Sequence, residues 1–184
     1  MATRPYATIA LVGISGATWV ALHAKPELYV KMTIIGPLHG DWWKLVTTQF
    51  AYANGVYEFV TVLTIAIFGW LLERRRGPAV VLALFLGGGV AGALVASAVY
   101  ADPVVSGGNA AALALLVAWA VPDLEAARVG SYYEGDLLGA GAIATVLLVV
   151  PFARPEASWL AGITGGVLGL VFGLGLEQSE RQAL

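Results

Sequence analysis

The sequence predicts an all-α membrane protein built as a bundle of six transmembrane helices. Of its 184 residues, 59% are hydrophobic and 12% are charged, whereas soluble domains carry roughly 25% charged residues. The mean hydropathy is +0.79. Six apolar stretches approach the roughly 20 residues that cross a bilayer core. They are Ala7–Leu22, Val56–Leu72, Ala79–Val99, Asn109–Val121, Leu137–Val150 and Trp159–Leu176. Little chain remains outside them, so we expect residues 1–184 to form a single transmembrane domain.

The ends of these stretches carry helix signals. Arg4 precedes the first apolar run as in a signal peptide, but there is no clear small-residue cleavage pattern and further spans follow, which favours a retained first helix. Pro78 suits the first turn of the third helix. We expect Pro122 and Pro151 to end the fourth and fifth spans, which are short and must be sheltered by neighbours or extend into their flanks.

The segment Lys25–Thr48 is too polar to cross a membrane. It contains Pro26 and Pro37 together with two adjacent tryptophans, Trp42 and Trp43. Because tryptophan is enriched at the level of lipid headgroups, we expect a long interfacial loop between the first and second helices.

The last helix carries glycines at every fourth position, Gly165, Gly169 and Gly173. Such a row leaves a groove without side chains, into which another helix backbone fits closely. The expected partner is the alanine-rich fourth helix, which includes Ala110 and Ala114.

The basic residues predict the orientation of the chain. An arginine cluster at 74–76 adjoins a helix end, and cytoplasmic loops are enriched in Lys and Arg. We therefore expect a multi-pass protein of the cell membrane with both termini in the cytoplasm. On that side would lie Arg4, Arg74, Arg75, Arg76, Arg128 and Arg181, and on the other Lys25, Lys31, Lys44 and Arg154.

Composition argues against several classes of site. The formal net charge is −2 and no basic stripe is present, so nucleic acid is not an expected partner. The chain has no cysteine, and its two histidines, His23 and His39, stand apart without a His-Glu-x-x-His run. We expect no bound metal and no cofactor.

Two short motifs carry a resemblance to a known family. The range Trp42–Phe50 reads WWKLVTTQF and resembles the rhomboid loop motif, Trp-Arg followed by Leu-x-Thr-x-x-Phe, with Trp43 and Lys44 in the first two places. The range Gly69–Gly77 has Gly, Glu73 four residues later and Gly four after that, as at the end of the second rhomboid helix. With the six spans and the glycine row, the chain resembles the rhomboid family, which implies a rhomboid-like six-helix bundle.

The resemblance also implies where a catalytic dyad would stand. Active rhomboids cleave transmembrane substrates with a serine in a Gly-x-Ser-Gly motif on helix four and a histidine on helix six. The matching stretch 107–110 reads GGNA, so Asn109 takes the serine position. Matching the glycine row puts Gly162 at the histidine position, or Ile163 if the register slides by one. An amide is neither a nucleophile nor a base at neutral pH.

The remaining family positions differ as well. The helix-two pair that helps to hold the oxyanion aligns with Tyr57 and Thr61, which can donate hydrogen bonds but do not reproduce the family's His and Asn. Asn109 itself has two interpretations: a helix N-cap, or a polar contact for a ligand or partner helix. Both hold if Tyr57 and Thr61 complete a hydrogen-bonded cluster with it.

One alternative register preserves catalysis. Ser106 is followed by Gly107 as a rhomboid serine would be, but its use would shift the helix by three residues and would leave the serine without a positioned base. His39, in the loop, is the candidate base under that hypothesis.

Two glutamates complete the candidate residues. Glu58 lies near the outer end of the second helix, where an intramembrane carboxylate is a functional candidate, although it can also reach headgroups or water. Glu73 is interpreted as a helix-end charge.

The leading hypothesis is a rhomboid-like pseudoprotease that binds or regulates other membrane proteins. By resemblance it would contact transmembrane clients through its helix-two and helix-five side, with membrane lipids around it. The alternatives are an intramembrane serine endopeptidase that uses Ser106, and an accessory subunit of a larger membrane complex.

Overall fold

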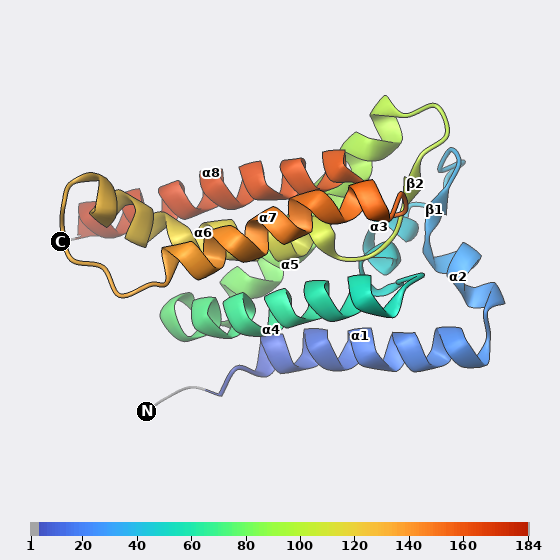
Figure 1. Cartoon of the computed structure of the whole chain (residues 1–184), viewed down its shortest axis with the longest axis horizontal. Coiled ribbons are helices and arrows are strands. Elements are labelled where there is room, and N and C mark those ends of the chain that lie inside the picture. The colour runs from blue at the N-terminus through green and yellow to red at the C-terminus, as the bar shows by residue number, and fades with distance from the viewer. Residues whose placement is uncertain (1–3, 184) are drawn as a thin grey trace.

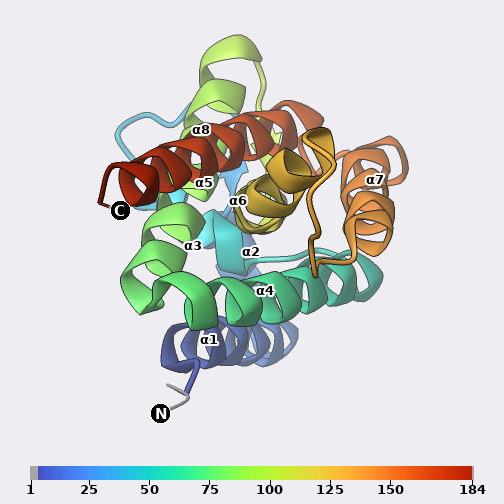
Figure 2. The ribbon, with the colours of Figure 1, turned by 90° about the vertical axis from the view of Figure 1, so that its left-hand side faces the viewer.

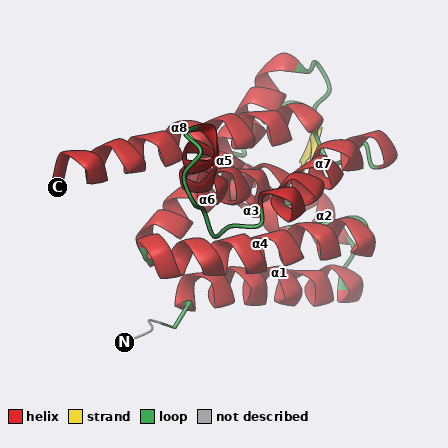
Figure 3. Ribbon diagram, turned by 60° about the vertical axis from the view of Figure 1, so that its left-hand side comes forward, coloured by secondary structure: helices red, strands yellow, loops and turns green. Residues whose placement is uncertain are grey.

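The computed structural model describes residues 4–183, with side chains for residues 4–179, and most of this chain is helical (Figures 1 and 3). The elements in chain order are α1 (Tyr6–Ala24), α2 (Glu27–Met32), β1 (Ile34–Ile35), α3 (Lys44–Thr47), the 3₁₀ helix η1 (Thr48–Phe50), α4 (Gly55–Arg76), α5 (Pro78–Val99), β2 (Val104–Val105), α6 (Asn109–Arg128), α7 (Leu137–Ala153) and α8 (Trp159–Ala183).

Five of the described helices, α1, α4, α5, α6 and α8, are long and apolar enough to cross a membrane. The sixth expected span, α7, is apolar but has only 17 residues, about 26 Å at 1.5 Å per residue. It therefore falls slightly short of a bilayer core of roughly 30 Å. The protein is a multi-pass, all-α membrane bundle.

Helix α6 occupies the centre of the bundle. It packs against α4, α5, α7 and α8, which surround it in the end-on view of Figure 2. Its small side chains, from Ala110 through Ala114 to Ala118, are buried. An alanine-rich helix can be enclosed on all sides because its backbone approaches several neighbours at once.

The long connection between α1 and α4 includes short regular elements. It contains α2, β1 and α3, and β1 pairs with β2 in an antiparallel ladder that matches Ile34 with Val105. Trp42 and Trp43 remain exposed, at 63% and 57% of their surface. The predicted loop thus includes regular structure, because its strand pairs with residues about 70 positions further along the chain.

Pro122 does not end α6, which continues to Arg128. A proline removes one intrahelical hydrogen bond, and in membrane helices neighbouring groups can compensate for that loss. Here the turn around Pro122 is anchored from α4: the guanidinium of Arg75 lies 3.5 Å from the carboxylate of Asp123 and 5.3 Å from the centroid of the Trp119 ring.

The glycine row of α8 lies against α6. A methyl group on Gly165 would overlap the carbonyl oxygen of Ala110, and one on Gly169 would overlap that of Ala114. At Gly173 a methyl group would lie 2.7 Å from Cγ2 of Val121. These three glycines set how closely the two helices approach.

The motif formed by Gly69, Glu73 and Gly77 joins α4 to α1. Gly69 leaves room for Thr8, Glu73 is buried, and Gly77 makes the turn into α5 with φ of +85°. The Glu73 carboxylate accepts hydrogen bonds from the amides of Ala7 and Thr8, at 3.0 and 2.8 Å, and from the Thr8 hydroxyl at 2.7 Å. Glu73 is therefore more than a helix-end charge, because it caps α1.

The two ends of the bundle differ. Helix α1 begins and α8 ends at the end of the bundle where α4 turns into α5 (Figure 1), here called the termini end. An ion pair between Arg76 and Glu177 joins α4 to α8 there. The opposite end carries α2, α3 and the strand pair and is called the loop end.

Candidate functional site

The chain enters α6 through a tight turn at residues 106–108. Gly107 has φ of +80°, and a methyl group there would lie 2.6 Å from the Tyr57 ring, so only glycine fits. The amide of Gly107 donates to the carbonyl oxygen of Thr48 at 2.8 Å, and that of Gly108 donates to the hydroxyl oxygen of Tyr52 at 3.1 Å. This turn delivers Asn109 as the first residue of α6.

Asn109 is not a helix N-cap. The cap residue is Gly108, and no side chain caps the helix. The Asn109 side chain is 2% exposed, and its Nδ2 donates to the carbonyl oxygen of Leu147 in α7 at 3.2 Å. Its Oδ1 accepts no hydrogen bond from the described residues. The N-cap interpretation was wrong because the amide reaches sideways to a neighbouring helix.

Pro151 explains why the Leu147 carbonyl is available. In an α-helix this oxygen would accept from the amide four residues later, which here belongs to Pro151 and does not exist. Asn109 supplies the missing donor. The expectation that Pro151 would end the fifth span was wrong for this reason, since α7 continues to Ala153.

Gly162 faces Asn109. A methyl group on Gly162 would lie 2.9 Å from Nδ2 of Asn109 and 3.2 Å from Cδ1 of Leu113. Ile163, the position reached by sliding the register by one, is 42% exposed. The structure therefore brings together the residues that match the dyad positions, and there is almost no space between them.

Tyr57 and Thr61 are both buried on α4, and neither makes a hydrogen bond with the side chain of Asn109, although the Tyr57 hydroxyl interacts with the Asn109 backbone. The Tyr57 hydroxyl donates to the main-chain carbonyl of Ser106 at 2.9 Å. The Thr61 hydroxyl has no hydrogen-bond partner among the described residues. The three side chains therefore do not bond one another, because the Tyr57 hydroxyl is directed to the main chain of the turn into α6.

Ser106 is 1% exposed, and both its side chain and its main chain make hydrogen bonds. Its Oγ accepts a hydrogen bond from the Tyr29 hydroxyl at 2.9 Å, and its amide donates to the carbonyl of Glu156 at 2.9 Å. Burial raises the pKa of Tyr29, so this hydroxyl stays protonated and donates. A serine in this environment has a donor beside it where a nucleophile needs an acceptor.

Neither histidine is placed to act as a base for Ser106. His39 is exposed in the segment before α3. His23 is also exposed, and its Nδ1 lies 2.9 Å from the carbonyl oxygen of Trp19. Among the residues with described side chains, no cluster of three metal-binding side chains is found either.

Two side chains that the sequence analysis did not single out close the site. Gln49 extends over Gly89 of α5, with its Nε2 3.2 Å from the carbonyl oxygen of Leu45. Tyr52 supports Gly108, and burial raises the pKa of its hydroxyl. Gly89 and Gly108 were the sequence signal for these two side chains, since a methyl group on Gly89 would overlap Gln49 and one on Gly108 would lie 2.9 Å from the Tyr52 hydroxyl oxygen.

The space left at the site is a cavity of about 10 Å³ beside Gln49, Asn109 and Ser158, roughly enough for one water molecule. The Oε1 atom of Gln49 and the Oδ1 atom of Asn109 have no protein hydrogen-bond partner among the described residues. A peptide cannot enter without movement of the surrounding helices.

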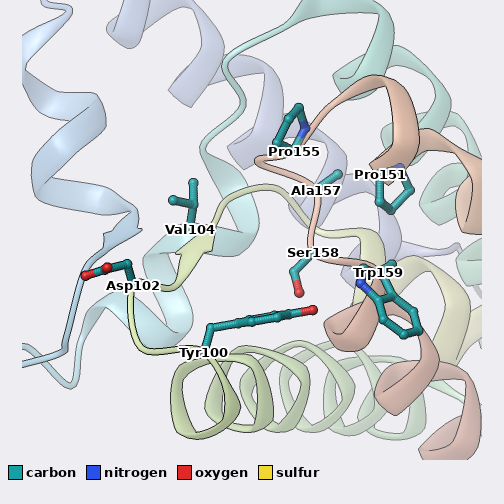
Figure 4. Close-up of a pocket in the computed structure, with 8 residues that line it drawn as sticks. All are labelled: Tyr100, Asp102, Val104, Pro151, Pro155, Ala157, Ser158 and Trp159. Carbon is teal, nitrogen blue, oxygen red and sulfur yellow. The ribbon is translucent and has the colours of Figure 1, made fainter.

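A larger pocket opens on the surface at the loop end (Figure 4), with a volume of about 360 Å³. Tyr100, Pro151 and Trp159 contribute to its walls, and Ser158 borders both this pocket and the small cavity. The Ser158 Oγ accepts from the amide of Ala161 at 3.3 Å. The start of α8 therefore separates the open pocket from the buried site.

Comparison with known proteins identifies the relatives of this bundle. Residues 39–179 match the family model of the Rhomboid domain. A RHOMBOID-like protein 9, chloroplastic, from Arabidopsis thaliana is 30% identical over 156 residues, which cover 79% of this chain and 35% of that protein. Sequences named ammonium transporter from Mycobacterium bovis and Mycobacterium tuberculosis are 34% identical over 150 residues, covering 75% of this chain and 30% of theirs.

This chain thus spans about a third of the length of these relatives. The match to the Rhomboid domain covers more than half of the chain and includes both motifs and the turn into α6. The chain therefore belongs to the rhomboid family.

Proposed function

We propose that this protein is a rhomboid pseudoprotease, a member of the family that retains the bundle and has lost serine-protease chemistry. The observation that carries the proposal is the contact between Asn109 and Gly162, which stand at the two dyad positions by resemblance to the family. Acyl transfer needs a nucleophile and a positioned base. The amide supplies neither, and the glycine has no side chain.

The binding part of the proposal rests on α7. Only Ala140 and Leu147 of this helix are buried, so it is loosely packed beside α4 and α6. A helix with few buried side chains can move aside at low cost. Transmembrane segments of client proteins would bind at the edge between α4 and α7, in a cell membrane with both termini on the cytoplasmic side.

A serine-reactive fluorophosphonate probe tests the loss of chemistry. We expect no labelling of the purified protein in detergent or in nanodiscs, because the Ser106 hydroxyl receives a hydrogen bond from Tyr29 and neither histidine is placed to take its proton. Ser106→Ala is the matched control, and an active serine hydrolase checks the probe. Labelling that disappears in Ser106→Ala would instead support the endopeptidase alternative.

Affinity capture from gently solubilised membranes tests the binding role. We expect several membrane proteins to be recovered below stoichiometric amounts, as a client-binding protein requires. One stable partner at equal stoichiometry would replace this proposal with that of an accessory subunit. Recovery of the chain alone would contradict both.

A further inference from the structure

A groove follows the seam between α1 and α4, which lie side by side along most of their lengths (Figure 1). Two hollows of about 380 Å³ each adjoin at Val12, one reaching Trp70 at the termini end and the other reaching Trp19 at the loop end. The groove residues of both helices recur every three or four positions. This is the pattern of a surface that receives a third helix.

The groove is open where a helix backbone would approach. A methyl group on Gly13 or Gly16 would meet no atom within 4 Å. Small residues on a lipid-facing helix permit close packing of another transmembrane helix. From Thr8 to Trp19 the groove runs for about 17 Å at 1.5 Å per residue, or about three helical turns.

Glu58 is the charged residue of this groove. Its side chain is only 9% exposed and borders the hollow near Trp19. No described side chain or amide donates a hydrogen bond to its carboxylate. His23 lies near enough to act on it electrostatically, but no hydrogen bond joins the two side chains. The start of α4 favours a negative charge nearby, but it leaves the carboxylate oxygens without donors.

We propose that the α1–α4 groove binds a transmembrane helix of another membrane protein, and that this helix presents a lysine or arginine to Glu58. The apolar hollows accept the helix body, the open glycines allow its approach, and the cation pairs with a carboxylate that is costly to leave unpaired in a membrane. A lipid tail would cover the apolar part and leave Glu58 unbonded.

This inference goes beyond the proposed function. The groove uses the α1 side of α4, whereas the clients of the pseudoprotease would bind at the α7 side. Binding in the groove does not depend on the missing dyad, so either proposal can fail without the other.

The test uses two synthetic transmembrane peptides of about 20 apolar residues. One carries a single lysine about one turn from its end, and the other has leucine in that place. Association with the full-length protein is measured by energy transfer in phosphatidylcholine vesicles. We expect the lysine peptide to bind about tenfold more tightly and Glu58→Gln to remove that preference.

Gly16→Leu should fill the groove and weaken binding of both peptides. Gly87→Leu is the matched control, because Gly87 on α5 also has open space around it and lies outside the groove. Size-exclusion chromatography verifies that each variant folds. Equal binding of the two peptides, or a lysine preference that survives Glu58→Gln, would overturn the proposal. The proposal would also be overturned if phosphatidylethanolamine displaced the peptides from the protein but not from Glu58→Gln. The occupant would then be a lipid amine.

Discussion

Asn109 and Pro151 compensate for each other. The proline leaves the carbonyl oxygen of Leu147 without its helical donor, and the amide of Asn109 supplies one from α6 at 3.2 Å. A buried carbonyl without a partner costs about 1–3 kcal/mol. Asn109, which stands at the nucleophile position by resemblance to the family, therefore has a structural task, which is to bind α7 to the central helix.

A double-mutant cycle measures this pairing. Asn109→Ala should lower the free energy of unfolding by about 1 kcal/mol through loss of the hydrogen bond. In a Pro151→Ala background the new amide at 151 can donate to Leu147, so the hydrogen-bond part of the loss should vanish. The measurement is unfolding in mixed detergent micelles, followed by circular dichroism. Strictly additive losses would show that the two residues are not coupled.

The helices themselves were largely predictable because each depends on a continuous apolar run of its own residues. The prediction that Pro122 and Pro151 end their spans was wrong, and for Pro151 the reason is a donor from another helix, Asn109. The strand Ile34–Ile35 was missed as well. A two-residue strand has no periodicity to detect, and its partner Val104–Val105 lies far along the chain.

The Glu73 carboxylate, which caps α1, can be tested by substitution. Glu73→Ala would leave the amides of Ala7 and Thr8 unpaired in a buried place, so we expect a loss of about 3 kcal/mol in the free energy of unfolding. Glu134→Ala is the control, because Glu134 is exposed between α6 and α7, and it should change stability by less than about 0.5 kcal/mol. Equal effects of the two substitutions would mean that α1 does not depend on this cap.

Across the whole molecule, the site was only partly predictable. Matching the motifs nominated Asn109 and Gly162, and the packed bundle places these two residues face to face. The hydrogen-bond partners were not predictable, because Leu147 lies 38 residues from Asn109 and Tyr29 lies 77 residues from Ser106. No local pattern encodes pairings that only the tertiary packing creates.

Because positions 109 and 162 face each other, we expect that a serine-histidine dyad can be rebuilt there. Asn109→Ser removes the Nδ2 atom that would lie 2.9 Å from a Cβ at position 162, and Gly162→His then adds a base beside the serine if α8 moves outward to accommodate the ring. The two changes are combined in a Pro151→Ala background, where Leu147 keeps a donor. A positioned base contributes about 10²–10⁴-fold to rate. We expect fluorophosphonate to label the introduced serine at least about 100-fold faster in the combined variant than with Asn109→Ser alone. Rates equal to those of the variant without histidine, in a protein that elutes as a folded monodisperse species, would show that positions 109 and 162 do not meet in the membrane.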